Sequence, residues 1–365
     1  MTPSVVIFMN MVTPYTRKLF DALKETVDLC VASCVRQEAN RNWADETTYS
    51  FDHVILPGKS IKLAENRFAH VNTGMGRLLS QRRPDVVILN GFYPTMLFAA
   101  LAAIRQRIPF LIAVDGWKES MPGSMYHRLI RPFMLRKSAG VITCSDKGFD
   151  YFLNCDMPAD RIFKAPIAPA WTYGRPRLPF TGRSYDLLWA AQLNHTVKNA
   201  QFFLEVVEKL AVLLPGIRVR VVGAGPAEGD VLHRLSATGI AYDFDRNVPW
   251  SEMADIFEKS KILLLPSLAE PWGLVCNEAM LCGTPCMVSR HVGASDELVV
   301  DGENGMVDDL DADLWVRSLH ELLGDQEAWE RLSVNAMDQA AGRNLATYVA
   351  GFTRAIASAV RSPGR

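Results

Sequence analysis

The chain has 365 residues, too many for one ordinary hydrophobic core, and this length fits two domains of common size. Hydrophobic residues make up 49% and charged residues 22%, a balance that excludes an intrinsically disordered chain. The net charge of −1 conceals an asymmetry, because residues 1–180 hold 23 Lys and Arg against 15 Asp and Glu, whereas residues 181–365 hold 16 against 25. The first half therefore either meets an anionic partner other than nucleic acid or carries basic, solvated helices.

Seven cysteines lie scattered in apolar context without a Cys-x-x-Cys pair, and this odd count favours a reducing, cytoplasmic compartment. The apolar residues Val5–Met9 lack a positively charged leader and predict a first strand in place of a signal peptide. The longest apolar run, Val86–Ile104, is interrupted by Asn90, Gly91 and Pro94. It therefore predicts a strand, a loop and a buried helix, not a membrane span.

Apolar runs of strand length alternate with helical stretches along the first half, a pattern typical of a parallel sheet covered on both faces. The expected strands are Val5–Met9, Leu29–Ser33, Val54–Leu56, Val86–Leu89, Phe110–Val114 and Val141–Cys144. Polar residues such as Asn10, Asn90 and Asp115 follow these strands. Ligands of open α/β sheets bind outside the carboxyl ends of the strands, so we expect these residues to line a crevice.

Residues 165–183 are rich in proline and show neither helical nor strand periodicity, which predicts a linker. A second series of strands follows it. These strands are expected at Leu187–Ala190, Val219–Val222, Ile262–Leu265 and Cys286–Ser289. Amphipathic helices follow Asp311, and the last helical stretch runs from Leu345 to Val360.

The segment from Pro266 to Pro285 combines an anion site with two carboxylates. Gly273 opens a helix whose first turn offers unpaired N–H groups and a positive dipole end, suited to a pyrophosphate. Glu270 lies before this helix and Glu278 in its second turn, where both could accept hydrogen bonds from sugar hydroxyls. Taken singly, Glu270 would only be a favourable charge near a helix start, and Glu278 a surface residue.

The whole segment resembles the family 4 retaining glycosyltransferases of GT-B fold. Glu270 and Glu278 have the spacing of the family's E-x7-E motif, and Ala279-Met280, Gly283 and Pro285 follow in order. Companion elements extend the resemblance over about residues 186–310. Lys198 matches the lysine of a family element that neutralises the diphosphate, Gln192 stands where the family has an arginine, and Gly223-Ala-Gly225 matches the family's glycine turn.

The resemblance implies an α/β protein of GT-B fold, with two Rossmann-like doubly wound domains facing a central cleft. Residues 1–170 would bind the acceptor and residues 184–340 the sugar nucleotide, joined by the linker 165–183. A helix over about 345–365 would cross back onto the first domain. Closure about the linker would exclude water and assemble the site.

The implied reaction moves a sugar from a nucleoside diphosphate to a hydroxyl of a glycan or lipid-linked saccharide, with retention of configuration. Lys198 and the N–H groups of Leu274 and Val275 would stabilise the leaving diphosphate, so that no metal or other cofactor is required. Glu270 would hold sugar hydroxyls and Glu278 the ribose. The other expected donor contacts are Gln192, Asn194, Gly223, Gly225, Val248, Trp250, Trp272 and Gly273.

Residues Asn247–Trp250 occupy the place of the family's base-reading loop. Guanine would favour a carboxylate there, and Glu252 is the one nearby in the sequence, so a UDP-sugar is preferred over a GDP-sugar. Trp250 is equally compatible with a core position.

In the first half Asp115 stands where many family members have a histidine facing the donor sugar. It would orient a sugar hydroxyl or assist an oxocarbenium-like transition state, or else serve as a helix cap or turn residue before Gly116. The acceptor side is expected to use Asn10, Thr13, Tyr15, Asn90, Tyr93 and Trp117.

The segment Tyr126–Lys137 interleaves cations with large apolar side chains, and Pro132 predicts that it forms two short helices. Together with other cations of the first half it would dock on an anionic membrane, or it is an amphipathic helix buried on one side. Those other cations are Lys59, Lys62, Arg67, Arg77, Arg82 and Arg83.

Two other functions stay open from the sequence. Gly223, Gly225 and Gly229, with Asp243 beyond them, come close to a dinucleotide fingerprint and would suit an NAD(P)-dependent oxidoreductase. The departures at Gln192 and Asp115 are also compatible with a catalytically silent binding subunit.

Overall fold

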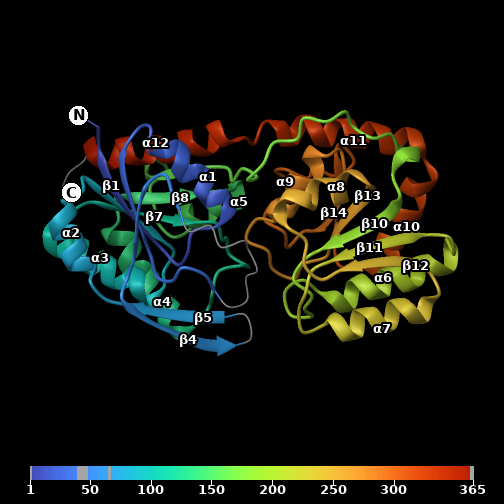
Figure 1. Cartoon of the computed structure of the whole chain (residues 1–365), viewed down its shortest axis with the longest axis horizontal. Helices are drawn as coiled ribbons and strands as arrows, with labels where there is room; N and C mark the ends of the chain where they lie inside the picture. Colours follow the sequence, from blue (N-terminus) through green and yellow to red (C-terminus); the bar gives the residue numbers. More distant parts are fainter. Residues whose placement is uncertain (1, 39–47, 65–66, 362–365) are drawn as a thin grey trace. The chain divides into compact units, whose positions relative to one another are not determined.

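The computed structural model describes residues 2–38, 48–64 and 67–361, with the side chains of Leu63, Ala64 and Arg67 outside the description. The chain forms two compact units (Figure 1). Unit 1 comprises residues 1–170 and 345–365, and unit 2 comprises residues 171–344. Each unit has a hydrophobic core of its own.

Unit 1 is built on a seven-stranded parallel sheet. Its strands are β1 (Ser4–Met9), β2 (Asp28–Ser33), β3 (Asp52–Ile55), β6 (Val86–Asn90), β7 (Phe110–Val114), β8 (Gly140–Thr143) and β9 (Ile162–Lys164). They lie in the order β3-β2-β1-β6-β7-β8-β9. The central strands are apolar along nearly their whole length because helices cover both of their faces.

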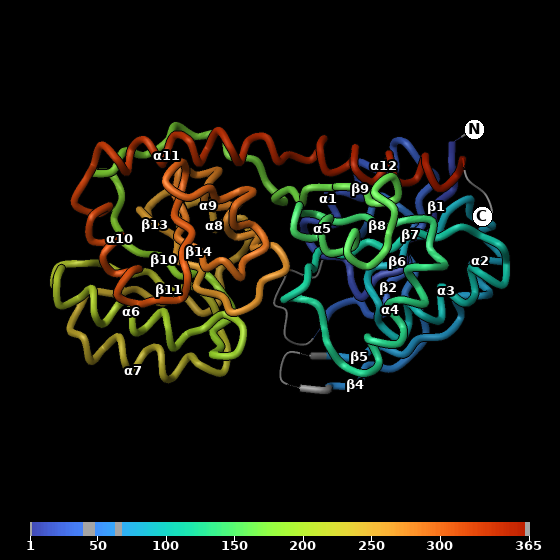
Figure 2. Tube along the Cα trace, turned by 180° about the vertical axis from the view of Figure 1, so that it is seen from behind, coloured from blue at the N-terminus to red at the C-terminus, as the bar shows by residue number. Residues whose placement is uncertain are grey.

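The helices of unit 1 form two layers. They are α1 (Pro14–Leu23), α2 (Met75–Arg82), α3 (Pro94–Gln106), α4 (Met125–Lys137), α5 (Asp146–Leu153), the 3₁₀ turn η1 (Ala159–Arg161) and α12 (Leu345–Arg361). Figures 1 and 2 show α2, α3 and α4 on one face of the sheet and α1 and α12 on the other. Helix α12 packs against α1 and against β6, β7, β8 and β9.

A two-stranded antiparallel hairpin, β4 (Gly58–Ala64) and β5 (Arg67–Asn72), was not expected from the sequence. The buried Asn72 fixes it, because its side-chain amide donates to the carbonyls of Cys34 and Leu56, both at 3.0 Å. Thr95 Oγ1 at the start of α3 donates to the His70 carbonyl at 2.8 Å. Polar contacts thus hold the hairpin against α3. Such contacts produce no periodic pattern of apolar residues, so the hairpin could not be recognised from the sequence.

Unit 2 contains a six-stranded parallel sheet. Its strands are β10 (Tyr185–Ala190), β11 (Arg218–Val222), β12 (Ala241–Asp245), β13 (Ser260–Leu265), β14 (Cys286–Ser289) and β15 (Gly305–Asp308), in the order β12-β11-β10-β13-β14-β15. Its helices are α6 (Ala200–Leu213), α7 (Glu228–Thr238), α8 (Met253–Glu258), α9 (Leu274–Leu281), α10 (Ala312–Gly324) and α11 (Gln326–Ala341), with 3₁₀ turns η2 (Phe180–Gly182) and η3 (Trp250–Glu252). Helices α6, α7 and α10 share one core layer, and α8 and α11 pack against α9.

All ten strands expected from the sequence are present, with ends shifted by at most two residues. The strands that were missed in the two main sheets are β9, β12 and β15, which are edge strands. An edge strand has a neighbouring strand on one side only and is therefore less buried than a central strand. Its sequence can accordingly contain more polar residues, which weakens the apolar pattern. Pro132 does not split its segment, since α4 runs continuously from Met125 to Lys137. The expectation of two short helices is therefore wrong, and the exposed position of Pro132 lets water satisfy the carbonyl that it leaves unpaired.

Within the described residues, no helix is long and apolar enough to span a bilayer. None of the seven cysteines forms a disulfide bond, and six of them are buried.

Gly351 on α12 tests how closely this helix packs on its own unit. A Cβ atom at Gly351 would lie 2.5 Å from the Ala165 Cα and 2.5 Å from the Lys164 carbonyl oxygen. Replacing a helical glycine with alanine normally stabilises a protein by up to about 1 kcal/mol. We expect Gly351→Ala to do the opposite and lower the free energy of unfolding by about 1–3 kcal/mol, measured by urea denaturation.

Gly229→Ala on α7 is the matched control, because a Cβ there would meet no atom within 4 Å. It should leave stability unchanged or slightly raised. Equal stability of the Gly351→Ala and Gly229→Ala proteins would contradict the close packing of α12.

Candidate active site

The centre of the sheet in unit 2 holds a topological switch point. Strands β10 and β13 are neighbours, and from there the chain continues outward in opposite directions, to β11 and β12 and to β14 and β15. Ligands of doubly wound sheets bind at such a point, outside the carboxyl ends of the strands. The loops that leave β10 and β13 contact each other there, since the Leu268 N–H donates to the Val197 carbonyl at 2.8 Å. The two segments with the strongest sequence signals are thus brought together.

Asn194 shapes the loop after β10. Its buried side-chain oxygen accepts from the N–H groups of Val197 at 2.8 Å and Lys198 at 2.9 Å, and its amide donates to the Gln192 carbonyl at 3.2 Å. The sequence predicted a donor contact for this residue. In the structure the side chain of Asn194 forms hydrogen bonds with the backbone of the loop that carries Lys198 and so holds this loop in place.

Lys198 and Glu270 form an ion pair across the switch point. The two side chains are 19% and 13% exposed, so the pair is largely shielded from bulk water. The Ser267 hydroxyl lies 3.4 Å from the same carboxylate oxygen. A cation and a carboxylate are therefore held together at the mouth of the sheet, each with part of its surface still accessible.

The loop after β13 is fixed by the turn at 291–293. The Glu270 N–H donates to the His291 carbonyl and the Gly293 N–H donates to the Glu270 carbonyl, both at 3.0 Å. Gly293 permits this contact, because a Cβ there would lie 2.0 Å from the Pro271 carbonyl oxygen. The backbone of Glu270 is thus clamped on both sides, which limits where its carboxylate can point.

Helix α9 begins immediately after this loop. Gly273 caps it in the left-handed conformation at φ +97°, and the N–H groups of Leu274 and Val275 fall in the first turn, where a helix offers no internal acceptor. The helix ends in a Schellman motif, in which the Thr284 N–H donates to the Ala279 carbonyl at 3.0 Å and Gly283 has φ +69°. The predicted helix start and stop are both confirmed.

Glu278 lies in the second turn of α9, on a half-buried side of the helix. Burial raises the pKa of its carboxyl to about 7, and the indole of Trp171 beside it offsets part of this rise. No pattern in the sequence connects Trp171 with Glu278, because tertiary packing alone brings them together. A carboxyl that titrates near neutrality next to a candidate ligand site is typical of a functional group.

Trp272 was expected among the donor contacts, and its side chain is not available for one. Its ring is 2% exposed, its indole N–H donates to Asn277 Oδ1 at 2.7 Å, and the Arg343 guanidinium lies over it, 4.6 Å from the ring centre. The indole therefore belongs to the support of α9. An aromatic residue beside a motif glycine fits either a ligand contact or the core, and the structure places this indole in the core.

The glycine turn after β11 packs on the loop after β10. A Cβ on Gly223 would lie 1.9 Å from the Ala191 carbonyl oxygen, and one on Gly225 would lie 2.2 Å from the Leu193 carbonyl oxygen. The Leu193 N–H also donates to the Ala224 carbonyl at 3.0 Å. These glycines are thus required by backbone contact within unit 2, whatever else approaches them.

Val248 and Trp250 lie half-buried in the loop that leads to η3. A cavity of about 220 Å³ opens beside Val248 and Glu252 and also reaches Asp245 and Asp255. The sequence pointed to Glu252 alone, so more carboxylates gather here than expected. Asp245 is paired with Arg220, which reduces its value as an acceptor for a base.

Unit 1 has a switch point of its own between β1 and β6. Asn10, Asn90 and Asp115 end or follow the adjacent strands β1, β6 and β7, so they line one stretch of the carboxyl edge, as predicted. Burial raises the pKa of Asp115 to about 6. Tyr348 on α12 is also buried, and this burial raises the pKa of its hydroxyl well above the ordinary value for tyrosine. The nearby Asp115 and Tyr15 raise this pKa as well.

The remaining residues of the expected acceptor side serve structural purposes as well. Thr13 caps α1 in a reciprocal capping box with Thr16, so its hydroxyl is engaged in the helix start. Tyr93 precedes α3 as its N-cap. Trp117 is 8% exposed, and the Lys147 ammonium lies 4.8 Å from the centre of its ring.

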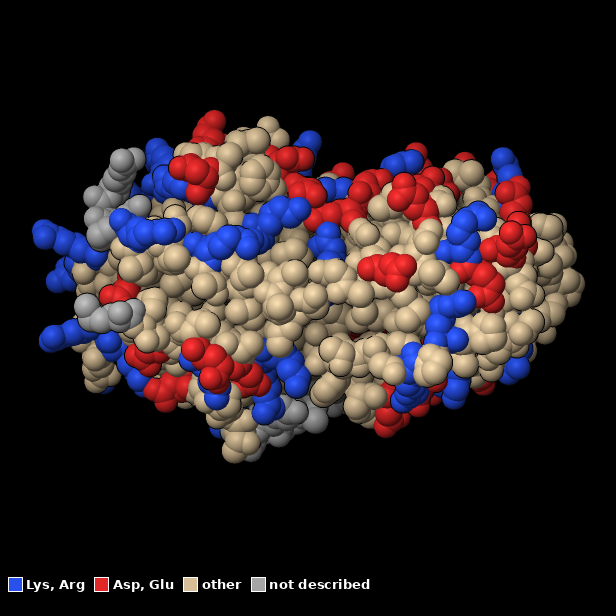
Figure 3. Space-filling model, turned by 90° about the horizontal axis from the view of Figure 1, so that it is seen from above, with Lys and Arg blue, Asp and Glu red and all other residues tan. Residues whose placement is uncertain are grey.

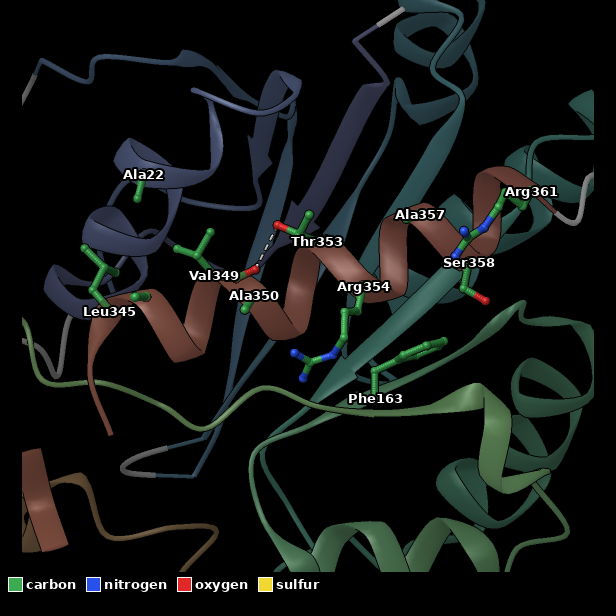
Figure 4. A pocket seen from close by; sticks show the side chains of 11 residues that line it. Ala22, Phe163, Leu345, Val349, Ala350, Thr353, Arg354, Ala357, Ser358 and Arg361 are labelled. Carbon is green, nitrogen blue, oxygen red and sulfur yellow. Dashed lines mark hydrogen bonds between the residues drawn. The ribbon is translucent and has the colours of Figure 1, made fainter. Parts of the chain in front are cut away.

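An apolar groove of about 990 Å³ lies elsewhere on unit 1, along α12. Figure 4 shows Leu345, Val349 and Ala357 of α12 along it, with Ala22 of α1 and Phe163 of β9 beside them. Its lining contains no carboxylate and its polar groups are few, so it offers no reacting group. It is distinct from the residues singled out by the sequence.

Comparison with known proteins identifies the class. Residues 184–325 match the family model for glycosyl transferases group 1, and residues 12–167 match the model for the glycosyl transferase 4-like domain. The chain therefore belongs to the family 4-type glycosyltransferases of GT-B fold. The glycine turn at Gly223 and Gly225 therefore belongs to a glycosyltransferase and not to an NAD(P)-dependent oxidoreductase.

Solved structures share the fold at low sequence identity. Anabaena HepE, solved in complex with UDP, matches with a TM-score of 0.74 and 14% identity over 97% of this chain and 100% of that chain. The lipopolysaccharide outer core galactosyltransferase WaaB matches with a TM-score of 0.71 and 13% identity over 97% and 99%.

Curated relatives match over shorter regions. The D-inositol 3-phosphate glycosyltransferase of Corynebacterium diphtheriae is 32% identical over 153 residues, which are 40% of this chain and 36% of that protein. The glycogen synthase of Mycobacterium tuberculosis is 24% identical over 238 residues, 61% of this chain and 56% of that protein. In both cases less than two thirds of the relative's length is covered.

Proposed function

We propose that this glycosyltransferase transfers a sugar from a UDP-sugar to a hydroxyl of a glycan or lipid-linked saccharide, with retention of configuration. The observation that carries the proposal is the Lys198–Glu270 pair at the switch point of unit 2, beside the positive end of α9. UDP is favoured over GDP because the similar HepE structures contain UDP and UDP-glucose. Assembly of a polysaccharide or glycolipid is the process that such a reaction would serve.

In the proposed mechanism the acceptor oxygen bonds to the anomeric carbon on the face that the diphosphate leaves. The bond from this carbon to the diphosphate oxygen breaks, and the acceptor proton passes to the departing diphosphate. Lys198 and the N–H groups of Leu274 and Val275 stabilise the negative charge that develops there, the work that a metal ion does in other transferases. Retention follows because attack and departure share one face.

The carboxylates hold the donor in this mechanism. Glu270 accepts hydrogen bonds from sugar hydroxyls and Glu278 from the ribose, while Lys198 keeps Glu270 oriented until the diphosphate takes its place as partner. Asp115 in unit 1 is the proposed carboxyl for a sugar hydroxyl or for an oxocarbenium-like transition state. We place the enzyme in the cytoplasm, in keeping with its seven cysteines that form no disulfide bond, with peripheral contact to a membrane.

A thermal-shift panel of UDP, GDP, ADP and NADH tests the donor, followed by an assay for transfer or hydrolysis of UDP-sugars. A nucleotide that binds the native state at 100 times its Kd stabilises it by about 2.7 kcal/mol and raises the melting temperature by mass action. We expect UDP to give the largest shift. Stabilisation by GDP alone would overturn the choice of base, and UDP binding without turnover of any UDP-sugar would assign the chain to a silent subunit.

A further inference from the structure

Helix α3 is only half buried, although the sequence predicted a buried helix. Its inner side packs Met96, Ala99 and Ala103 into the core of unit 1, where each is fully buried. Its outer side exposes Phe98 at 44% and Leu101 at 45%. Two large apolar side chains one turn apart are thus in water, without a described element covering them.

Helix α4 exposes apolar side chains in the same layer. Met125 is 68% and Leu129 66% exposed, among the highest values for large apolar residues in the described chain. Arg128 is exposed beside them on the same side of the helix. Helices α3 and α4 pack against each other on one face of the sheet (Figures 1 and 2), so their outer sides adjoin. We call this surface the α3–α4 face, made of Phe98, Leu101, Arg105, Met125, Arg128 and Leu129.

The charge of this face has one sign. Neither α3 nor α4 contains an Asp or a Glu, whereas Arg105, Arg128, Arg136 and Lys137 lie on them. Within the described part of the chain, these four cations form no ion pair. Burying Met125 and Leu129 against any surface would therefore bring unpaired cations up to it, and only an anionic surface would compensate them.

The opposite layer of unit 1 differs in this respect. Arg17 there pairs with Asp21 and Lys164 with Asp146, and Figure 3 shows acidic side chains among the basic ones on that face. Lys18 of α1 and Arg354 and Arg361 of α12 form no ion pair within the described residues. The groove along α12 lies in this layer; its lining includes Arg354 and Arg361, and α1, which borders it at Ala22, contains Asp21. We prefer the α3–α4 face to the groove, because neither of its helices contains an acidic residue that would repel an anionic surface, whereas α1 beside the groove contains Asp21.

We propose that the α3–α4 face docks the enzyme on an anionic phospholipid bilayer. Phe98, Leu101, Met125 and Leu129 enter the boundary between head groups and acyl chains, while the arginines extend to lipid phosphates. The lysines of the neighbouring hairpin, Lys59 and Lys62, are exposed and add to the attraction. This inference extends the proposed function by naming the surface that brings the enzyme to a lipid-linked acceptor.

Vesicle flotation of the whole protein tests the docking. We expect the wild type to float with vesicles that contain phosphatidylglycerol and to remain free with phosphatidylcholine alone. The double variants Met125→Glu/Leu129→Glu and Phe98→Glu/Leu101→Glu should each lower the bound-to-free ratio at least ~10-fold. The matched control Val212→Glu/Leu213→Glu changes two exposed residues of α6, 78% and 53% exposed, and should bind like the wild type. Equal binding to both vesicle types, or full binding by both double variants, would overturn the proposal.

Two further measurements separate other outcomes. Hydrolysis of a UDP-sugar in the absence of lipid and the melting-temperature shift with UDP should be unchanged in the double variants, since these residues lie outside the donor site. Loss of docking with normal hydrolysis thus concerns the face alone, whereas normal docking without hydrolysis would contradict only the donor assignment. If sedimentation instead shows a dimer that the double variants dissociate, the face is an interface between two copies and the membrane proposal is wrong.

Discussion

Replacing Lys198 with alanine is expected to lower the rate of donor turnover by at least ~10²-fold, because the leaving diphosphate then loses the one side-chain cation held at the switch point by the loop after β10. Most of the loss should appear in kcat, since the negative charge on the leaving oxygen develops in the transition state. Steady-state kinetics of the variant against the wild type, with circular dichroism to verify folding, measures the effect.

Lys209→Ala provides a matched control in the same unit. This lysine lies on α6 in an exposed ion pair with Asp313 and has no assigned role at the switch point. Its loss should leave the rate near that of the wild type. Kinetics of Lys198→Ala that resemble those of Lys209→Ala would remove the leaving-group role from Lys198. The double variant Lys198→Ala/Glu270→Ala should be no slower than the worse single variant if the two residues act as one unit.

Replacing Glu278 with alanine should also lower donor turnover by at least ~10²-fold, through loss of the ribose acceptor and misplacement of the donor. Its raised pKa gives this prediction a pH signature. At a pKa of about 7, the carboxyl is mostly protonated near pH 6 and mostly ionised near pH 8, so UDP should bind up to ~10-fold more tightly at the higher pH. Isothermal titration of wild type and Glu278→Gln measures this, and the Gln variant should show no such rise.

The same carboxyl links stability to pH. Its pKa rises from 4.5 to about 7 on folding, so between these values the folded state binds the proton more tightly than the unfolded state. This contribution is fully present below about pH 4.5 and is lost as the pH rises through about 7. The full shift would amount to about 3 kcal/mol, and the partial exposure of the side chain reduces the expected effect to about 1–2 kcal/mol. Glu278→Gln should therefore gain this much relative to the wild type between about pH 5 and pH 8 in urea unfolding.

The sequence predicted the central strands and the segment around α9 well, for a physical reason. Strands such as β1 and β13 are buried on both faces, so nearly all of their residues are apolar. A continuous apolar run of this kind can be recognised from the local sequence alone. Gly273 and Gly283 are likewise local, since a helix start and a helix stop require particular backbone angles at particular positions.

The features that were missed depend on contacts between distant parts of the chain. The hairpin β4–β5 is fixed by the amide of Asn72, and Glu278 owes its environment to burial beside Trp171. The sequence likewise does not show that Asn277 and Arg343 enclose the indole of Trp272. Such long-range partners carry no signal in a single sequence.

Unit 1 is built from two segments that lie far apart in the chain, and this affects the order in which the protein folds during synthesis. Its core is closed by α12, whose Tyr348, Phe352 and Ile356 are buried in it, while unit 2 is continuous from residue 171 to 344. A ribosome delivers α12 only after every residue of unit 2 has been synthesised, so unit 2 can complete its own core first. Until then the first unit lacks the helix that covers strands β6 to β9 on one face of its sheet. The half of the enzyme that is translated first is thus the half that finishes folding last.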